Sequence, residues 1–452
     1  MQVLQQPKQK KTKLKKVLGV AFGISIVIGG TIGAGILRVP GSIAALLPDA
    51  RLIIGCWIIL GLFIMLSASS YAELTTMLPK AGGAYNYIKR AFGNYAGFIN
   101  GWFDFICNAI APAYFCIVLS EYFILVFPQL QGYNTLLALV ELTIFMLINF
   151  PGVKSGSIAQ QISSAIKMLL FVALIIACFL KGSLHHSIFD GQQTKLIQGG
   201  LVFAIFKSMQ LIMGTYDGWM AVSFFAEEDT DPTKNIPKSY LLGALTVSLL
   251  YILINVAILY VLPVASIAGS PLAASQASAI AFGKNGTMFM TIISIFSLLS
   301  ILNAYIMIPP RILYGLSRDG YFIKQGTILN TGGTPVYSAL FCYLLALVLI
   351  VFSSFDLLFS LGAFMMTVVT GFAFASLIKL RKTEPDLPRP YKAWGYPYST
   401  FIAITVSIAL LIGFSISDRK SLIIMLAVVL ISLPCYKFLF RRTTTDTSIK
   451  KN

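Results

Sequence analysis

Two short stretches of the sequence combine glycines with groups that could hold a charged ligand, inside segments that are otherwise apolar. The first is GGTIGAGILRVPG, residues 29–41, and the second is GTYDGW, residues 214–219, which adds a carboxylate and two aromatic rings. Glycine lets a helix unwind, and an unwound helix leaves backbone N–H and C=O groups without partners. Free N–H groups bind an anion and free C=O groups bind a cation, so one break could hold both ends of a zwitterion.

Close helix packing is the other explanation for these glycines. Gly29 and Gly33 are separated by three residues, which is the spacing of a close contact between membrane helices. The first stretch alone leaves packing and unwinding open. The second stretch favours unwinding, because transporters built from inverted repeats place their site between two interrupted helices at corresponding positions of the two halves.

The elements that must position both stretches are membrane-spanning helices. Of the 452 residues, 57% are hydrophobic and 11% are charged. Apolar blocks long enough to cross a bilayer recur along the whole chain, and none alternates like the strand of a membrane barrel. We expect an all-α polytopic membrane protein with about twelve spans, at residues 17–39, 52–77, 95–126, 135–150, 158–180, 201–226, 240–262, 288–312, 336–352, 357–378, 398–417 and 422–440.

The two glycine stretches fall in the first and the sixth of these spans, which are corresponding positions of a five-plus-five inverted repeat. We therefore expect one transmembrane domain over residues 17–440, with tails at 1–16 and 441–452. Within it, repeat one covers 17–180, repeat two covers 201–378, and two further helices cover 398–440.

The net charge of +17 is interpreted as a topology signal rather than as a nucleic-acid surface. Lysine and arginine concentrate in the tails and in every second loop, which places both termini in the cytoplasm. The six cysteines lie in or beside spans, without paired spacing in a loop, and are expected to be buried free thiols. His185 and His186 lie in an outer loop, where a solvated pair is one interpretation and a metal or pH-sensing site is the other.

Two ionisable residues lie inside predicted spans. Lys167 is in the fifth span, where a lysine is costly unless it meets a cavity or a partner, or extends to the membrane surface. Asp217 is in the second glycine stretch. Its carboxylate either favours a cationic group of a ligand or caps a half-helix that starts near Gly218.

Three motifs in order resemble the amino acid–polyamine–organocation superfamily, and most closely its L-type amino acid transporter branch and bacterial relatives. They are GTIGAGI in the first span, YDGW followed by FAEEDTDPTKNIPKS (residues 225–239), and LNAYIMIPPRILYGLSRDG (residues 302–320). The resemblance covers nearly the whole chain. It implies a LeuT-type fold in which the first and sixth spans are broken around a central site.

The resemblance also implies roles for single residues. The first break, with Ile28, Ile32, Gly33, Ala34 and Gly35, would bind a substrate carboxylate through its amides and contribute carbonyls near Ile28. The second break would accept the substrate ammonium through groups around Gly214, Thr215 and Asp217.

Further residues match the family's gating and coupling positions. Tyr216 and Trp219 either close over the substrate as an outer gate or are ordinary packing. Asn303 either lines the site or bonds across helices. Lys167 takes the place of a sodium ion, as a fixed tether or as a proton carrier.

The polar inner loop after the sixth span contains Glu227 and Glu228. These acids are expected to pair with Lys80, Lys89 or Arg90 as an inner gate, or else to lie in a plain solvated loop. The outer loop around residues 127–134 has no cysteine, so a disulfide-linked heavy chain is not expected.

These features predict a secondary active transporter of α-amino acids in a bacterial inner (plasma) membrane, working by alternating access as an exchanger or a proton-linked importer. The expected partners are the amino acid, protons and the lipid bilayer, without a cofactor or a metal. An amine or polyamine transporter and a transport-deficient amino acid sensor are the alternatives. An enzyme is not expected, because no catalytic constellation lies at membrane depth.

Overall fold

The computed structural model describes residues 14–33, 35–181, 200–270, 273–352, 355–417 and 419–448. Ala34, His185 and His186 lie outside this part of the chain. The helices are α1 (Val20–Thr31), α2 (Gly35–Leu46), α3 (Ala50–Met77), α4 (Tyr85–Phe92), α5 (Asn94–Val126), η1 (Pro128–Leu130), α6 (Asn134–Asn149), α7 (Val153–Lys181), α8 (Gly200–Thr215), η2 (Trp219–Glu228), α9 (Pro232–Val261), α10 (Val264–Ile267), α11 (Ala273–Phe282), η3 (Gly283–Asn285), α12 (Gly286–Arg318), η4 (Lys324–Thr327), α13 (Val336–Phe352), α14 (Phe355–Thr383), α15 (Tyr398–Ser417) and α16 (Arg419–Ser448).

The predicted all-α polytopic fold is confirmed. Eight helices of the described chain are long and apolar enough to cross a bilayer, and α1, α6 and α13 are shorter apolar helices. The predicted first span is divided between α1 and α2, and the sixth between α8 and η2. Both glycine stretches therefore interrupt their helices.

The first span ends later than its composition suggests. We expected it to stop at residue 39, before Pro40, but α2 continues through Pro40 to Leu46. Proline removes one hydrogen bond and kinks a helix without always ending it. The interruption lies between Thr31, the last residue of α1, and Gly35, the first residue of α2, and its described residues are Ile32 and Gly33.

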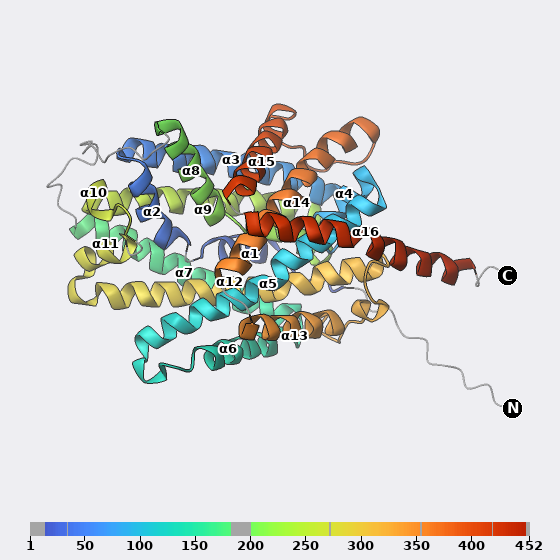
Figure 1. Ribbon diagram of the computed structural model, residues 1–452, viewed down its shortest axis with the longest axis horizontal. Helices are drawn as coiled ribbons and strands as arrows, with labels where there is room; N and C mark the ends of the chain where they lie inside the picture. Colours follow the sequence, from blue (N-terminus) through green and yellow to red (C-terminus); the bar gives the residue numbers. More distant parts are fainter. Residues whose placement is uncertain are drawn as a thin grey trace.

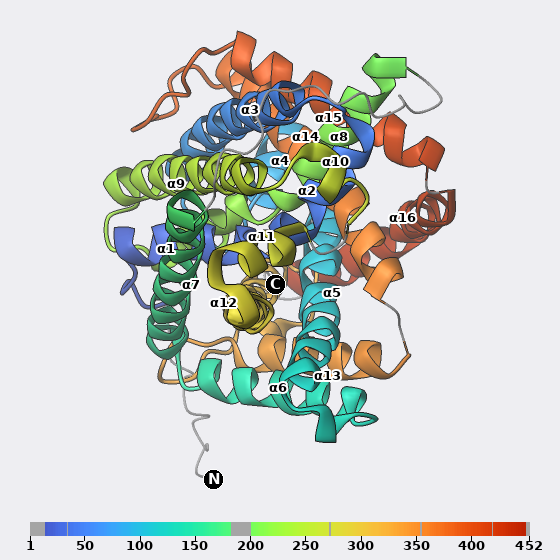
Figure 2. The same cartoon turned by 90° about the vertical axis from the view of Figure 1, so that its left-hand side faces the viewer.

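The helices form one bundle whose long axis is horizontal in Figure 1, with α10 and α11 near the left-hand end and α4 nearer the right. Corresponding spans of the two predicted repeats contact each other, since α3 packs on α9, α5 on α12 and α6 on α13. Figure 2 looks along the bundle and shows α16 at its edge. The most apolar stretch of the segment that contains α12 is 72% buried, whereas that of α16, within Arg419–Phe438, is 11% buried.

The loops that were predicted to share one side of the membrane come together at one end of the bundle. Lys89 Nζ lies 2.9 Å from Asp319 Oδ2, which joins the loops after the second and eighth spans. Arg90 pairs with Glu384 at 2.6 Å, and Arg381 pairs with Glu73. The Arg90 hydrogen bonds hold the pKa of Glu384 below its usual value. All six cysteines are free thiols, of which Cys435 is exposed and the others are buried.

Candidate functional site

The break in the first span is closed by side chains from two other helices. After Thr31, the last residue of α1, Ile32 adopts an extended conformation. Lys167 Nζ, from α7, donates to the carbonyl of Gly29 at 3.1 Å and also to that of Ile32. Ser297 Oγ, from α12, donates to the same Ile32 carbonyl at 3.0 Å. Lys167 is 0% exposed, so it points into the bundle rather than to the membrane surface.

A buried polar network continues beside this break. Asn303 donates to Gln160 Oε1 at 2.8 Å and to the Gly156 carbonyl at 3.1 Å, and it accepts from Asn149 at 2.9 Å. A Cβ atom added at Gly29 would lie 1.7 Å from Gln160 Nε2. Close packing therefore explains Gly29, although the helix unwinds a few residues further on.

The break in the sixth span contains a residue in the left-handed region. Gly218 has φ +97°, and a Cβ atom there would lie 2.3 Å from the carbonyl oxygen of Gly30. The two breaks therefore meet backbone to backbone. Asp217 Oδ1 accepts the N–H of Gly218 at 2.9 Å, so this carboxylate stabilises the turn in front of η2.

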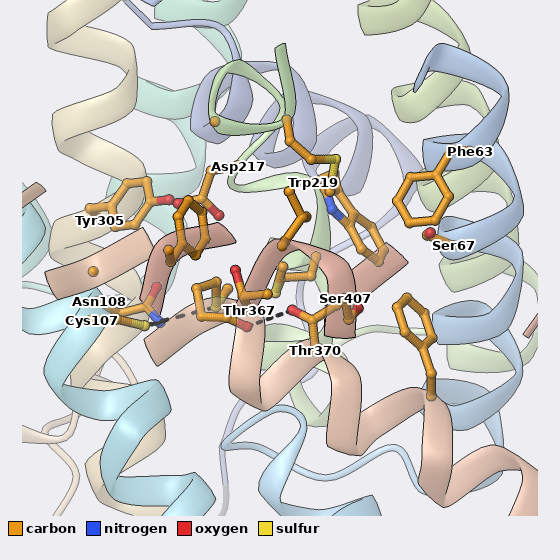
Figure 3. A pocket seen from close by; sticks show the side chains of 18 of the residues that line it. Phe63, Ser67, Cys107, Asn108, Asp217, Trp219, Tyr305, Thr367, Thr370 and Ser407 are labelled. Atoms are coloured by element: carbon orange, nitrogen blue, oxygen red, sulfur yellow. Dashed lines mark hydrogen bonds between the residues drawn. The ribbon is translucent and has the colours of Figure 1, made fainter. Parts of the chain in front are cut away.

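A cavity of about 80 Å³ lies beside the second break. Figure 3 shows the Asp217 carboxylate and the Tyr305 hydroxyl pointing toward each other, with Trp219 nearer Phe63. The lining combines one carboxylate with hydroxyl, amide, thiol and apolar groups. Its residues are Phe63, Ser67, Cys107, Asn108, Tyr114, Met213, Gly214, Asp217, Trp219, Met220, Tyr305, Gly362, Met366, Thr367, Thr370, Phe374, Ser407, Leu410 and Phe414.

Comparison with known proteins identifies the family. A family model described as amino acid permease matches residues 18–433. The chain belongs to the amino acid permease family. The permease is 27% identical over 432 residues to the serine/threonine exchanger SteT of Bacillus subtilis (strain 168), covering 94% of this chain and 96% of the relative.

Two mammalian transporters are also similar to the permease. The b(0,+)-type amino acid transporter 1 of Mus musculus is 28% identical over 428 residues, covering 90% of this chain and 84% of the relative. The large neutral amino acids transporter small subunit 2 of Oryctolagus cuniculus is 29% identical over 399 residues, covering 84% and 72%. The predicted superfamily and its transporter class are confirmed, and the chain is not an enzyme.

The structure brings only part of the predicted site to the cavity of the permease. Gly214, Asp217 and Trp219 line it. The Ile28 carbonyl accepts the N–H of Ile32 at 3.0 Å, as in an intact helix. Asn303 lies in the cross-helix network described above, away from the cavity lining.

Other predicted residues lie behind the cavity wall. Tyr216 is 1% exposed, and its ring centroid lies 4.9 Å from that of Tyr251 and 6.2 Å from that of Trp57. Tyr216 is therefore packed between α3 and α9. Gly33 is buried in the first break, and Gly35 and Thr215 face each other, since a Cβ atom at Gly35 would lie 3.2 Å from Thr215 Cγ2.

Much of the permease site had no counterpart in the prediction, including the cavity lining from α3, α5 and α14. Ser407, Leu410 and Phe414 of α15 form part of the cavity wall, although this helix lies outside both predicted repeats. Tyr251 of α9 donates to the carbonyls of Thr31 and Thr215, at 3.1 and 2.8 Å. These side chains come from long apolar runs without a breaker or a charge, so the sequence carries no signal for them.

The predicted inner-gate acids form ion pairs, but with other partners than expected. Glu227 Oε2 accepts from Arg318 at 2.7 Å and from the Ala81 N–H at 2.9 Å. Glu228 Oε1 accepts from Arg311 at 3.0 Å, and both side chains of this pair are buried. The prediction that Lys80, Lys89 or Arg90 supplies the partners is wrong.

The segment directly before α1 is hydrogen-bonded to the end of η2, which carries these acids. The backbone N–H groups of Val17 and Leu18 donate to the carbonyl of Glu228, at 3.0 and 3.1 Å. Leu18 also forms an isolated parallel bridge with Asp229. Because α12 carries both arginine partners, this end of the permease is closed by contacts among the first, sixth and eighth spans.

Proposed function

We propose that this permease carries α-amino acids across a bacterial inner membrane by alternating access, as an exchanger or a proton-linked importer. The observation that carries the proposal is the cavity beside the second break, where the half-buried Asp217 carboxylate faces aromatic and hydroxyl side chains. The names of the relatives, a serine/threonine exchanger and two amino acid transporters, support the same class of substrate.

The two ends of an α-amino acid would be held by the two breaks. In this proposal Asp217 and the carbonyl of Gly214 receive the ammonium, while the amides at the start of α2, around Gly33, Ala34 and Gly35, receive the carboxylate. The close approach of Gly35 to Thr215 supports this arrangement, because it places the start of α2 beside the end of α8. The substrate side chain would point toward α14 and α15.

The ion pairs at the end of the bundle where the loops after the second, sixth and eighth spans meet would form the inner gate. We place this end, with both termini, in the cytoplasm because it gathers the basic loops. Glu227–Arg318 and Glu228–Arg311 join the sixth span to the eighth. Such pairs would separate when the half-helices move apart and re-form when they return.

Counterflow into proteoliposomes tests the proposal. Vesicles preloaded with unlabelled serine, leucine or arginine are mixed with a trace of the labelled amino acid, with and without a pH gradient. We expect transient accumulation of at least one of them, and dependence on the gradient distinguishes proton coupling from exchange. If no α-amino acid accumulates although the protein is folded, or if the decarboxylated amine binds as tightly as its parent acid, the proposal is wrong.

A pair of glycine variants connects this test to the first break. Gly33→Val is expected to abolish counterflow while the protein still inserts, because its Cβ atom would lie 3.1 Å from Ile301 Cδ1, beside the amides that receive the carboxylate in this proposal. Gly55→Val in α3 is the control, since a Cβ atom there meets nothing within 4 Å. Wild-type affinity in Gly33→Val would limit the first break to a packing role.

A further inference from the structure

A second cavity, of about 280 Å³, lies at the end of the bundle that carries the ion pairs of Glu227 and Glu228. Its walls come from three segments that are distant in the sequence: the residues before α1, the start of α7 with the residues in front of it, and the loop before α13. Val17 is one of the lining residues, and its N–H donates to the Glu228 carbonyl at 3.0 Å. The two cavities share no lining residue, so the amino acid site does not use this one.

The floor of the second cavity is held by contacts between two loops. A Cβ atom at Gly152 would lie 2.8 Å from Gly332 Cα, and the Val153 N–H donates to the Gly332 carbonyl at 3.4 Å. Asn330 connects the same loops, because its side chain donates to the Phe150 carbonyl at 2.6 Å. These contacts fix the first turn of α7 against the loop before α13 and give the cavity a defined shape.

The lining of the second cavity includes two lysines and no acid. Lys15 packs its stem against the loop before α13, since a Cβ atom at Gly333 would lie 3.6 Å from Lys15 Cγ. Lys154 is in the first turn of α7. Both lysines are exposed, and within the part of the chain that the structure describes neither forms an ion pair. Two like charges at one cavity attract an anion, which removes their repulsion.

The exposed face of α7 indicates what kind of anion fits. Ile158 and Ile162 follow Lys154 at spacings of four residues, so the three side chains share one face of the helix. The isoleucines are 48% and 56% exposed, as expected for side chains that contact acyl chains in the membrane. Lys154 precedes Ile158 by about 6 Å along the helix axis. A molecule with its phosphate at Lys154 can therefore lay an acyl chain along this apolar face, which a free phosphate would leave unused.

We propose that the second cavity binds the phosphate of an anionic glycerophospholipid between Lys15 and Lys154, with an acyl chain along Ile158 of α7. The bound lipid connects the segment before α1 to the start of α7. Because the same segment is hydrogen-bonded to the end of η2, the lipid stabilises the closed arrangement of this end of the permease. Lipid binding is separate from the amino acid site and does not rest on the proposed function.

Native mass spectrometry of the permease, titrated with phosphatidylglycerol or with phosphatidylcholine, tests the site. The double variant Lys15→Gln, Lys154→Gln is expected to bind phosphatidylglycerol about thirtyfold more weakly, since each lysine beside an anionic surface contributes about fivefold. Binding of phosphatidylcholine should not change. The matched control is Lys80→Gln with Lys238→Gln, which removes two other exposed lysines and should bind phosphatidylglycerol like the wild type.

A second measurement follows the segment before α1 directly. Hydrogen–deuterium exchange of residues 14–19 is expected to be about threefold slower or more in phosphatidylglycerol nanodiscs than in phosphatidylcholine nanodiscs, because a bound ligand opposes local opening. The double variant should lose this difference. Soluble glycerol phosphate, added to the phosphatidylcholine nanodiscs, should not reproduce it, because it lacks the acyl chain that α7 receives.

Several results would overturn the lipid site. They are equal binding of the two lipids by the wild type, wild-type binding in the double variant, and an equal loss in the control, which would assign the effect to the charge of the whole surface. Full protection by glycerol phosphate would show a site for a free anion instead of a lipid. The comparison of the two lipids on the wild-type protein needs no variant, so it decides the proposal even if the double variant fails to fold.

Discussion

The two helix breaks have similar composition but different surroundings. In the first, the carbonyls of Gly29 and Ile32 are occupied by Lys167 and Ser297, and neighbouring helices bury the break. In the second, Asp217 and its neighbours line the cavity. The first break is therefore closed by protein groups on its carbonyl side, whereas the second presents polar groups to a space that a ligand could fill.

This difference shows that a glycine cluster indicates where a membrane helix can unwind, but not what its free backbone groups meet. Backbone groups at membrane depth need partners from protein or from a polar cavity. At the first break a lysine and a hydroxyl supply them. We therefore expect variants at the two breaks to differ in their effects on stability and on counterflow, and the largest expected effect comes first.

Removal of the Lys167 ammonium should have the largest effect. Lys167→Met leaves two buried carbonyls without their charged donor, and hydrogen bonds to charged groups contribute about 1.5 to 3 kcal/mol each. We expect a loss of about 3 kcal/mol or more in stability, seen as a lower melting temperature in detergent, together with loss of counterflow. Lys207→Met in α8, a half-buried lysine, is the control. A normal melting temperature in Lys167→Met would show that the first break does not depend on the cation.

The second break should depend on its backbone conformation. Gly218→Ala forces an alanine to φ +97° and brings its Cβ atom 2.3 Å from the Gly30 carbonyl oxygen, which cannot move freely. The strain alone costs about 1 to 3 kcal/mol, so we expect counterflow to fall about tenfold or more. In Gly214→Ala, in the last turn of α8 before this break, the added Cβ atom meets nothing within 4 Å, and this variant should remain active. Equal activity of the two variants would contradict the close meeting of the breaks.

The span pattern was predictable because it depends on local composition. Apolar length placed most helices to within several residues, and the two glycine clusters marked the two interruptions. The glycines also indicated the position of the first break, since α1 ends at Thr31 and α2 begins at Gly35, but they did not indicate that α2 continues beyond residue 39. Pro40 is the stronger local breaker, yet α2 continues through it, while the unwound residues lie where Lys167 and Ser297 supply donors. The donors that satisfy the unwound carbonyls therefore come from α7 and α12, which are distant from the first span in the sequence.

Contacts between distant segments were the part that sequence reasoning could not assign. Positive charge after the second span suggested partners for Glu227 and Glu228. The ion pairs are formed instead by Arg311 and Arg318, which lie seven residues apart on one face of α12. Likewise, nothing in the apolar α15 distinguishes the face with Leu410 from the others. Which side of a uniformly apolar helix meets a cavity is set by tertiary packing rather than by periodicity.

The smallest of these effects should distinguish the two interpretations of Asp217. Asp217→Asn keeps an oxygen that can accept the Gly218 N–H but removes the charge, whereas Asp217→Ala removes both. If the carboxylate receives the substrate ammonium, the asparagine variant should raise the half-saturation concentration for counterflow about tenfold, the cost of roughly one charged hydrogen bond. If it only stabilises the turn, Asp217→Asn should match the wild type and Asp217→Ala alone should be impaired. The second result would leave both breaks with structural roles and move the ammonium site elsewhere in the cavity.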